Sequence, residues 1–358
     1  MTDVLEQRAL NRALLARQHL LDRTSRSTLE LVEHLVGMQA QAPLASYVGL
    51  WSRRHRFDPA ELSDLMASRR VVRATLMRAT IHLVSSADAL VLRPLTQRVM
   101  SGSFNGHFSR LLDGVDVDAV VKVGQELLEQ QPRTRVELRE LLGARWPDWD
   151  PDAMAFAVTY LVPSVQVTPR GVWGSHGPAA LTTIESWLGR PLDPAPSIDQ
   201  LMLRYVAAFG PASVMDVQTW SGLTRLREVV ERLPLRRYVD AQGNDLYDVE
   251  GVVLPDPDTP APVRFLPEYD NLLLSHADRS RVIPDDRRVP LPPGNGATAG
   301  TVLVDGMFQA EWRLRENVLR VEPFRQFTPA ERDDLAAEAA RLTGFIAPGR
   351  DVTLELPI

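Results

Sequence analysis

Residues 71–84 read VVRATLMRATIHLV, which is two runs rich in β-branched residues on either side of a short break. The runs Val71–Leu76 and Thr80–Val84 have the composition and length of short strands. Because only three residues separate them, we expect them to pair as an antiparallel hairpin. This hairpin decides the fold, since it interrupts a helical pattern that occupies everything before it.

The residues before the hairpin predict three helices. Residues 4–21 carry leucines at helical spacing. Ser27–Glu30 is a capping box, with a serine N-cap and a glutamate three residues later. Asp58–Glu61 places a capping aspartate before a proline in the first turn. Three helices followed by a hairpin is the order of a winged helix-turn-helix unit.

The same order recurs further along the chain, and repetition of one supersecondary unit is an architectural signal. The second set has helices at 134–142 and 150–162 and a strand, turn and strand at 165–173. The third has helices at 198–209, 213–220 and 224–233 and a hairpin at 238–249. We therefore predict an α+β protein with three tandem winged-helix (helix-turn-helix) units.

Two proline-rich joints, at 190–196 and 255–262, mark boundaries, since proline-rich segments act as semi-rigid spacers. After the second joint, strands are predicted at 263–266, 300–304, 309–314, 318–321 and 352–356, with a helix at 328–342. This pattern suggests a small C-terminal β-barrel. The expected domains are 1–130 (first winged helix with a helical extension), 131–197 (second), 198–255 (third) and 256–358 (barrel, helix and strand).

Composition excludes several classes of protein. The 358 residues contain no cysteine, which removes disulfides and thiolate metal sites. There is no apolar run of membrane-spanning length and no signal peptide at the N-terminus, so we expect a cytoplasmic, nucleoid-associated protein. The zinc-hydrolase, serine-hydrolase, P-loop and dinucleotide-binding motifs are missing as well. The familiar hydrolase, kinase and dehydrogenase functions therefore lack their key residues in this sequence.

Charge is distributed unevenly along the chain. The net charge is −6, yet residues 51–100 hold nine arginines against four acidic residues. A basic block inside an acidic protein fits a confined face for binding DNA phosphates. An ordinary solvated surface explains the block equally well on charge alone.

Gln39 and Gln41 lie where the second helix should end, in the segment GMQAQAP (37–43). On a continuing helix, side chains two residues apart point about 200° apart, and the pair would be a solvated helix end. In an extended segment they face the same side, and the two carboxamides would converge. Pro43 disfavours helix just before it, which makes the extended alternative plausible.

The Gln-Ala-Gln segment, followed by YVGLW (47–51), resembles the Gln–aliphatic–Gln signature of the AlkZ/YcaQ-type winged-helix DNA glycosylases. RATIHLV (78–84), AFGPAS (208–213) with WSGL (220–223), and LPEYDNLLLSHADRSR (266–281) resemble later segments of that family, in the same order. The likeness spans nearly the whole chain. The sequence carries the double-glutamine form of the signature and not the Gln–aliphatic–Asp form of the family's other branch.

The resemblance implies a monofunctional glycosylase without a metal or cofactor, which removes alkylated purines, bulky adducts or interstrand crosslinks from double-stranded DNA during repair. Three units in one chain favour a monomer. It implies catalytic roles for Gln39 and Gln41. The residues that we expect to contact DNA are Arg53, Arg54, Arg56, Arg78, His82, Arg279 and Arg281. Two alternatives stay open: a non-catalytic winged-helix regulator or lesion sensor, and a protein that sequesters a DNA-reactive natural product.

Overall fold

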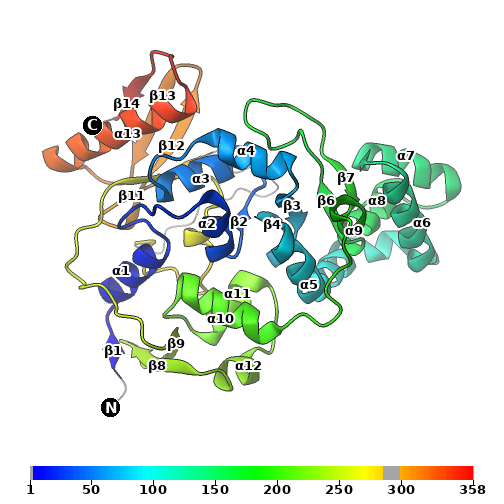
Figure 1. Ribbon diagram of the computed structural model, residues 1–358, viewed down its shortest axis with the longest axis horizontal. Coiled ribbons are helices and arrows are strands. Elements are labelled where there is room, and N and C mark those ends of the chain that lie inside the picture. Colours follow the sequence, from blue (N-terminus) through cyan, green and yellow to red (C-terminus); the bar gives the residue numbers. More distant parts are fainter. Residues whose placement is uncertain (1–2, 285–298, 358) are drawn as a thin grey trace.

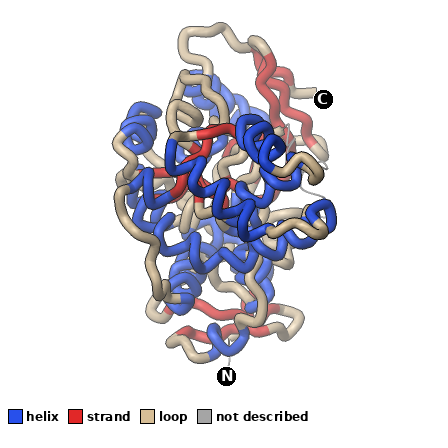
Figure 2. Tube along the Cα trace, turned by 90° about the vertical axis from the view of Figure 1, so that its right-hand side faces the viewer, coloured by secondary structure: helices blue, strands red, loops and turns tan. Residues whose placement is uncertain are grey.

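The computed structural model describes residues 3–284 and 299–357, and it is an α+β protein with three sheets in that part of the chain. Helices alternate with loops along the tube in Figure 2, and strands gather in short groups between them. None of the helices in the described ranges is long and apolar enough to cross a bilayer.

The N-terminal third contains the predicted helices and the predicted hairpin, together with a helix that the sequence did not predict, α3 (Ala45–Arg53). The helices on either side of it are α2 (Thr28–His34) and α4 (Pro59–Ala67). The strands are β2 (Met38–Gln39), β3 (Val71–Thr75) and β4 (Ile81–Ser85), and a short 3₁₀ turn, η1 (Met77–Ala79), forms the hairpin tip. The capping box at Ser27 and the aspartate cap at Asp58 are both present, as the sequence predicts.

The hairpin of β3 and β4 separates two apolar cores, because alternate side chains of a strand point to opposite faces. Val71 and Leu83 pack with α2, α3 and α4 on one face. Val72, Ala74 and Val84 pack on the other face, against residues from the long helix α5 (Ser86–His107) and from the third helical group. The hairpin thus lies between α2, α3 and α4 on one side and α5 with the third helical group on the other (Figure 1).

The second helical group lies at the far end of the long axis from the C-terminal sheet (Figure 1). It contains η2 (Ser109–Leu112), α6 (Val117–Gln130), α7 (Arg135–Arg145), α8 (Pro151–Leu161) and α9 (Ile184–Leu188). Its strands are β5 (Arg133–Thr134), β6 (Ser164–Gln166) and β7 (Ala180–Thr183). They join the first hairpin in one six-stranded sheet of order β2-β4-β3-β6-β7-β5.

One strand of this second group was predicted at the wrong place. The partner of β6 is not at Val172–Trp173 but at β7, several residues later. The intervening segment leaves the sheet because Trp173 packs against Tyr47 of α3 and Phe345, with ring centroids 4.9 and 5.3 Å apart. Pro169 also removes a backbone donor there. Tertiary packing of one aromatic ring therefore overrides the local strand pattern.

The third helical group contains α10 (Ile198–Phe209), α11 (Val214–Ser221) and α12 (Arg227–Glu231), followed by the hairpin of β8 (Leu235–Asp240) and β9 (Asp245–Val249). The predicted first helix is shorter than expected: β1 (Val4–Leu5) pairs in parallel with β8, and α1 (Gln7–Arg17) begins only after it. Leu5 is drawn into the sheet because it packs with Leu10, Tyr238 and Leu246.

The C-terminal region is a five-stranded sheet and not a closed barrel within the described residues. Its strands are β10 (Arg264–Leu266), β11 (Gly300–Val304), β12 (Met307–Arg315), β13 (Val318–Pro323) and β14 (Thr353–Glu355), in that order. The edge strands β10 and β14 are at opposite sides. The helix α13 (Pro329–Ile346) covers one face of this sheet, since its residues Leu335, Ala339 and Leu342 pack in the same core. In a closed barrel, that face would be buried in the interior.

A buried ion pair fastens the C-terminal region to α3. Two nitrogens of Arg53 donate to the two carboxylate oxygens of Asp270, at 2.7 and 2.8 Å, and both side chains are about 2% exposed. Asp270 also caps η3 (Asn271–Leu273) by accepting from the backbone of Leu272. Removing one partner of such a pair leaves a buried charge without compensation.

We therefore expect Asp270→Asn to lower the free energy of unfolding by about 3–5 kcal/mol in a urea titration. Asp245→Asn is the matched control, since Asp245 pairs with Arg237 at the surface, where solvent screens the charges. We expect the control to change stability much less. Equal decreases in the free energy of unfolding of the two variants would show that the buried pair stabilises the protein no more than the surface pair does.

Candidate active site

The end of α2 leads into β2, which places Gln39 in extended backbone, and Gln41 follows two residues later in a bend. Val36 and Gly37 both have positive φ, of 52° and 88°, and this turn reverses the chain into β2. A Cβ at Gly37 would lie 2.5 Å from a methyl group of Val84, so only glycine lets the turn approach β4 this closely. Gln39 then pairs with His82 across the two strands.

The two carboxamides meet, as the extended alternative predicts. Nε2 of Gln39 donates to Oε1 of Gln41. Gln39 is 7% exposed, whereas Gln41 is half-buried. Gln41 is therefore the member of the pair that lies nearer to solvent.

Arg78, at the hairpin tip, holds the other end of the Gln39 amide. Its guanidinium donates to Oε1 of Gln39 at 2.7 Å, to the carbonyl of Trp220 at 2.6 Å and to Oδ1 of Asn271 at 3.1 Å. Burial, followed by the nearby charge of Arg279, lowers the pKa of Arg78 to about 10, so the group is still protonated at neutral pH. Arg78 was expected to contact DNA, but these bonds turn it inward.

Asn271 is a site residue that sequence reasoning did not single out. It joins the site by accepting from Arg78 and donating to the carbonyl of Gly37 at 3.3 Å. It lies in the segment 266–281, whose resemblance was noted, but nothing in the segment's pattern distinguishes this asparagine. Only the fold brings it beside the turn that carries Gln39.

His82 is fully buried beside Gln39. Its Nδ1 lies 2.9 Å from the carbonyl of Thr80, which can only accept, so Nδ1 carries the proton. Nε2 is buried and has no hydrogen-bond partner among the residues that the structure describes. Burial, reinforced by the charge of Arg78, lowers the pKa of His82 to about 3, and the ring is neutral at physiological pH. A charged contact with phosphate is therefore not available to it.

The other predicted arginines differ in exposure. Arg53 is 1% exposed and Arg281 is 5% exposed; Arg53 binds Asp270, and Arg281 donates to the carbonyl of Pro211 at 2.8 Å. Both were expected at the DNA surface, and burial gives them structural contacts instead.

Besides the half-buried Arg78, three of the predicted arginines keep some access to solvent. Arg54 is half-buried and bonded to Glu61 at 2.6 Å. Arg279 is also half-buried, and Arg56 is exposed. These three remain candidates for phosphate contact.

A small cavity adjoins the site. It has a volume of about 10 Å³ and is lined by Gln39, Arg53, Asp270 and Asn271 among others. This is room for about one water molecule with several polar neighbours. A purine does not fit into it.

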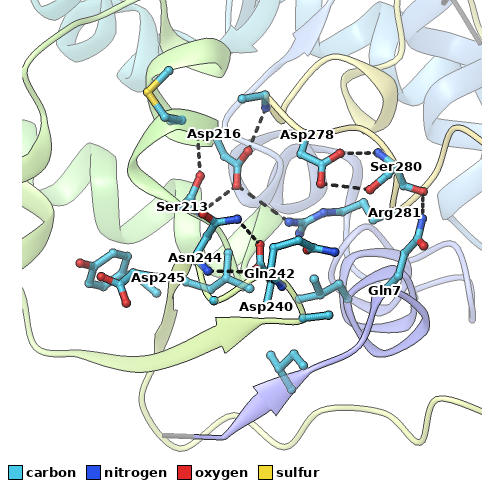
Figure 3. A pocket seen from close by; sticks show the side chains of 18 of the residues that line it. Gln7, Ser213, Asp216, Asp240, Gln242, Asn244, Asp245, Asp278, Ser280 and Arg281 are labelled. Carbon is cyan, nitrogen blue, oxygen red and sulfur yellow. Dashed lines mark hydrogen bonds and ion pairs between the residues drawn. The ribbon is translucent and has the colours of Figure 1, made fainter. Parts of the chain in front are cut away.

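A much larger cavity, of about 600 Å³, lies elsewhere, between β1, the turn of the third hairpin and the start of α11 (Figure 3). Its acidic lining residues are Glu6, Asp216, Asp240, Asp245 and Asp278, and its arginines are Arg227 and Arg281. An excess of carboxylates repels phosphate, so this cavity is a poor place for a DNA backbone. Several of its carboxylates are used by the fold, as when Asp216 accepts from the backbone of Ser213 and Ala277.

No group of three or more metal-ligating side chains occurs within residues 3–284 and 299–357. The polar groups around the glutamine pair are amides, a guanidinium and an imidazole, and the carboxylate of Asp270 on the adjoining cavity is paired with Arg53. These can place a water molecule and orient a dipole, but none is a strong base or acid at neutral pH.

The depressed pKa of His82 predicts a pH dependence of stability. In the unfolded chain the imidazole titrates near pH 6.5. Below that pH the unfolded state takes up a proton that the folded state refuses until about pH 3. Stability attributable to His82 is therefore complete above pH 6.5 and declines as pH falls from 6.5 toward 3.

We expect His82→Asn, which keeps a donor for Thr80, to show a shallower loss of stability than the wild type in urea titrations from pH 7.5 to 4.5. His19 and His276 have depressed pKa values too and contribute equally to both proteins. Parallel curves for the two proteins would contradict a buried neutral His82.

Comparison with known proteins places the chain in a family. A family model described as DNA glycosylase AlkZ-like matches residues 32–345. Among solved structures, Streptomyces sahachiroi DNA glycosylase AlkZ superposes with a TM-score of 0.77 at 18% identity, covering 99% of this chain and 100% of that one. None of the curated proteins matches the chain in sequence. Because the family model spans most of its length, the chain belongs to the AlkZ-like family of DNA glycosylases.

Proposed function

We propose that this protein is a monofunctional DNA glycosylase that hydrolyses the N-glycosidic bond of alkylated purines during DNA repair, with bulky adducts and interstrand crosslinks within its range. The observation that carries the proposal is the meeting of the Gln39 and Gln41 carboxamides in a chain of this family. We further propose that the helical groups are three winged-helix units, with the expected boundaries 1–130, 131–197, 198–255 and 256–358, and that the protein acts as a monomer.

The chemistry of an alkylated purine suits a site without acid or base. A purine alkylated at N7 or N3 already carries positive charge. Its glycosidic bond breaks with the electron pair going to the base, which leaves neutral. The sugar becomes oxocarbenium-like, as in other glycoside hydrolyses. Water then bonds to C1′ and loses a proton to solvent, so the site must position water and stabilise a sugar cation.

We assign different tasks to the two glutamines. Gln39 has both ends of its amide engaged, Oε1 by Arg78 and Nε2 by Gln41, so it acts as the fixed member. Gln41 lies nearer to solvent and is the member that meets the substrate. A carboxamide oxygen can accept two hydrogen bonds, which allows it to hold water while its dipole faces the developing cation.

The small volume beside the pair favours an open mode of attack. Enzymes that flip a base need a pocket that encloses it. The cavity that adjoins Gln39 has only about 10 Å³. A lesion that stays outside a closed pocket can be bulky, which supports adducts and crosslinks as substrates.

Methylated duplex DNA provides the first test of the activity. We expect the wild type to release 7-methylguanine and the double variant Gln39→Ala/Gln41→Ala to lose release by about 10²–10⁴-fold, the range for positioned catalytic groups. The measurement is single-turnover base release followed by chromatography, with DNA affinity determined in parallel. Retained affinity in the variant would separate catalysis from binding.

Other outcomes have definite meanings. Equal release by the two proteins would move the chemistry away from the glutamines. No release by wild type, from methylated DNA and then from a bulky or crosslinked adduct, would sink the enzymatic proposal in favour of a DNA-binding regulator or sensor.

DNA contact is proposed for Arg54, Arg56 and Arg279, which keep access to solvent, and not for the half-buried Arg78, whose guanidinium bonds to Gln39. Each phosphate contact releases counterions and adds about 1 to the slope of log affinity against log salt. We therefore expect Arg56→Ala to reduce that slope by about 1 in fluorescence-anisotropy titrations. Arg325→Ala is the control, because Arg325 is engaged by Glu331 at the start of α13. Indistinguishable slopes for Arg56→Ala and wild type would remove Arg56 from the interface.

A further inference from the structure

We propose that Arg78 is a positioning residue, which fixes the orientation of the Gln39 carboxamide and, through it, that of Gln41. The inference rests on the proposed function for its catalytic consequence, but the orientation itself is a property of the protein alone. It replaces the phosphate contact that the sequence predicts for this arginine.

The hairpin tip presents Arg78 to the site in an unusual conformation. Arg78 has φ 54° and ψ 20°, and Ala79 also has positive φ. Non-glycine residues adopt this left-handed region at an energetic cost, so surrounding contacts must hold them there. The tip is closed by backbone bonds from Leu76 to Thr80 and from Thr80 to Met77.

The acceptors of Arg78 come from three separate parts of the chain. Trp220 offers a carbonyl at the end of α11, Gln39 belongs to β2, and Asn271 begins η3. Gly222 permits this contact, because a Cβ there would lie 3.3 Å from the backbone of Arg78. A cation at the C-terminal end of a helix is also favoured by the helix dipole. The guanidinium therefore sits where the first and third helical groups and the C-terminal region meet.

The chemical reason for an arginine is its donor-only character. A carboxamide can turn by 180° and exchange its oxygen and nitrogen, since each makes hydrogen bonds of similar geometry. A guanidinium cannot accept, so the amide oxygen of Gln39 must face it. Nε2 must then face Gln41 and donate to its Oε1. The order Arg78, Gln39, Gln41 thus sets one arrangement of the pair out of several.

Lysine cannot reproduce this contact fully. An ammonium is a point donor on a flexible stem, whereas the planar guanidinium reaches three fixed acceptors at once. We therefore expect Arg78→Lys to keep part of the effect and Arg78→Met to lose it.

The first test is single-turnover release of 7-methylguanine at saturating methylated DNA. We expect a rate loss of about 10–100-fold for Arg78→Met, the range for residues that orient others, with Arg78→Lys between it and wild type. DNA affinity and its salt slope should stay near wild type. Arg93→Met is the matched control, because Arg93 is also buried, has its pKa lowered to about 10 and bonds to a backbone carbonyl, that of Tyr160, away from the glutamines. It should lose stability without losing rate.

Chemical rescue separates orientation from folding damage. Added guanidinium ion, far below unfolding concentrations, should restore part of the rate of Arg78→Ala, whereas urea, which has a similar shape but no charge, should not. Equal effects of the two additives would overturn the role of the charge. A salt slope reduced in Arg78→Met, with an unchanged rate at saturating DNA, would return Arg78 to phosphate binding.

A measurement without substrate keeps the inference testable if the protein excises no base. In protein labelled with ¹⁵N-glutamine, the side-chain amide signal of Gln39 is identified by its loss in Gln39→Ala. We expect Arg78→Met to move this signal toward the position of a free amide and to speed its hydrogen exchange, and Arg93→Met to leave it in place. An unchanged Gln39 signal in Arg78→Met would refute the positioning role, whatever the enzymatic activity.

Discussion

A guanidinium that is buried away from water needs oxygen acceptors for its hydrogen bonds, and in this protein the acceptors join distant parts of the chain. Arg53 finds Asp270, Arg17 finds Asp248 at 2.7 Å, and Arg264 donates to the carbonyl of Leu20 at 3.0 Å. In each case the partner lies in a segment far away in sequence. Because an unpaired buried charge costs several kcal/mol, these contacts can form only if the distant segments assemble together. The helical groups and the C-terminal sheet are fastened by paired cations as well as by apolar packing.

The candidate site is a special case of the same constraint. Gln39 and Gln41 are two residues apart where β2 ends in a bend, and their carboxamides meet there. What fixes their orientation is not local: Arg78 reaches Gln39 only because the hairpin tip docks on the end of α11, and Asn271 completes the contact from the C-terminal region. His82 on the adjacent strand is buried and neutral at physiological pH, so it adds no charge beside the glutamine pair.

The arginine-rich stretch 51–100 shows why composition overstated the DNA-binding face. The stretch does carry an excess of positive charge, but Arg53, Arg73 and Arg93 are each 1% exposed and donate hydrogen bonds to acceptors inside the protein. Arg56, by contrast, is exposed and available to a phosphate. Sequence alone cannot distinguish a buried arginine from an exposed one, because the residue type is the same. An arginine is buried only where the fold supplies an acceptor for it. The acidic cavity in Figure 3 likewise shows that the size of a hollow does not identify the site; the charge of its lining argues against DNA there.

By itself, the sequence determined the features that depend on neighbours along the chain. These are the capped helices, the hairpin at 71–84 and the recurrence of helices followed by strands. The sequence left open whether the two glutamines ahead of Pro43 converge, and the structure shows that they do. Only the tertiary structure decided that Val4–Leu5 joins the third hairpin, that the partner of β6 lies beyond Trp173, that the C-terminal strands form an open sheet in the described residues, and that Arg78 holds Gln39. The physical reason is common to all four. Each depends on an acceptor, a ring or a strand edge supplied by a remote segment, and local propensity carries no information about what a remote segment will offer.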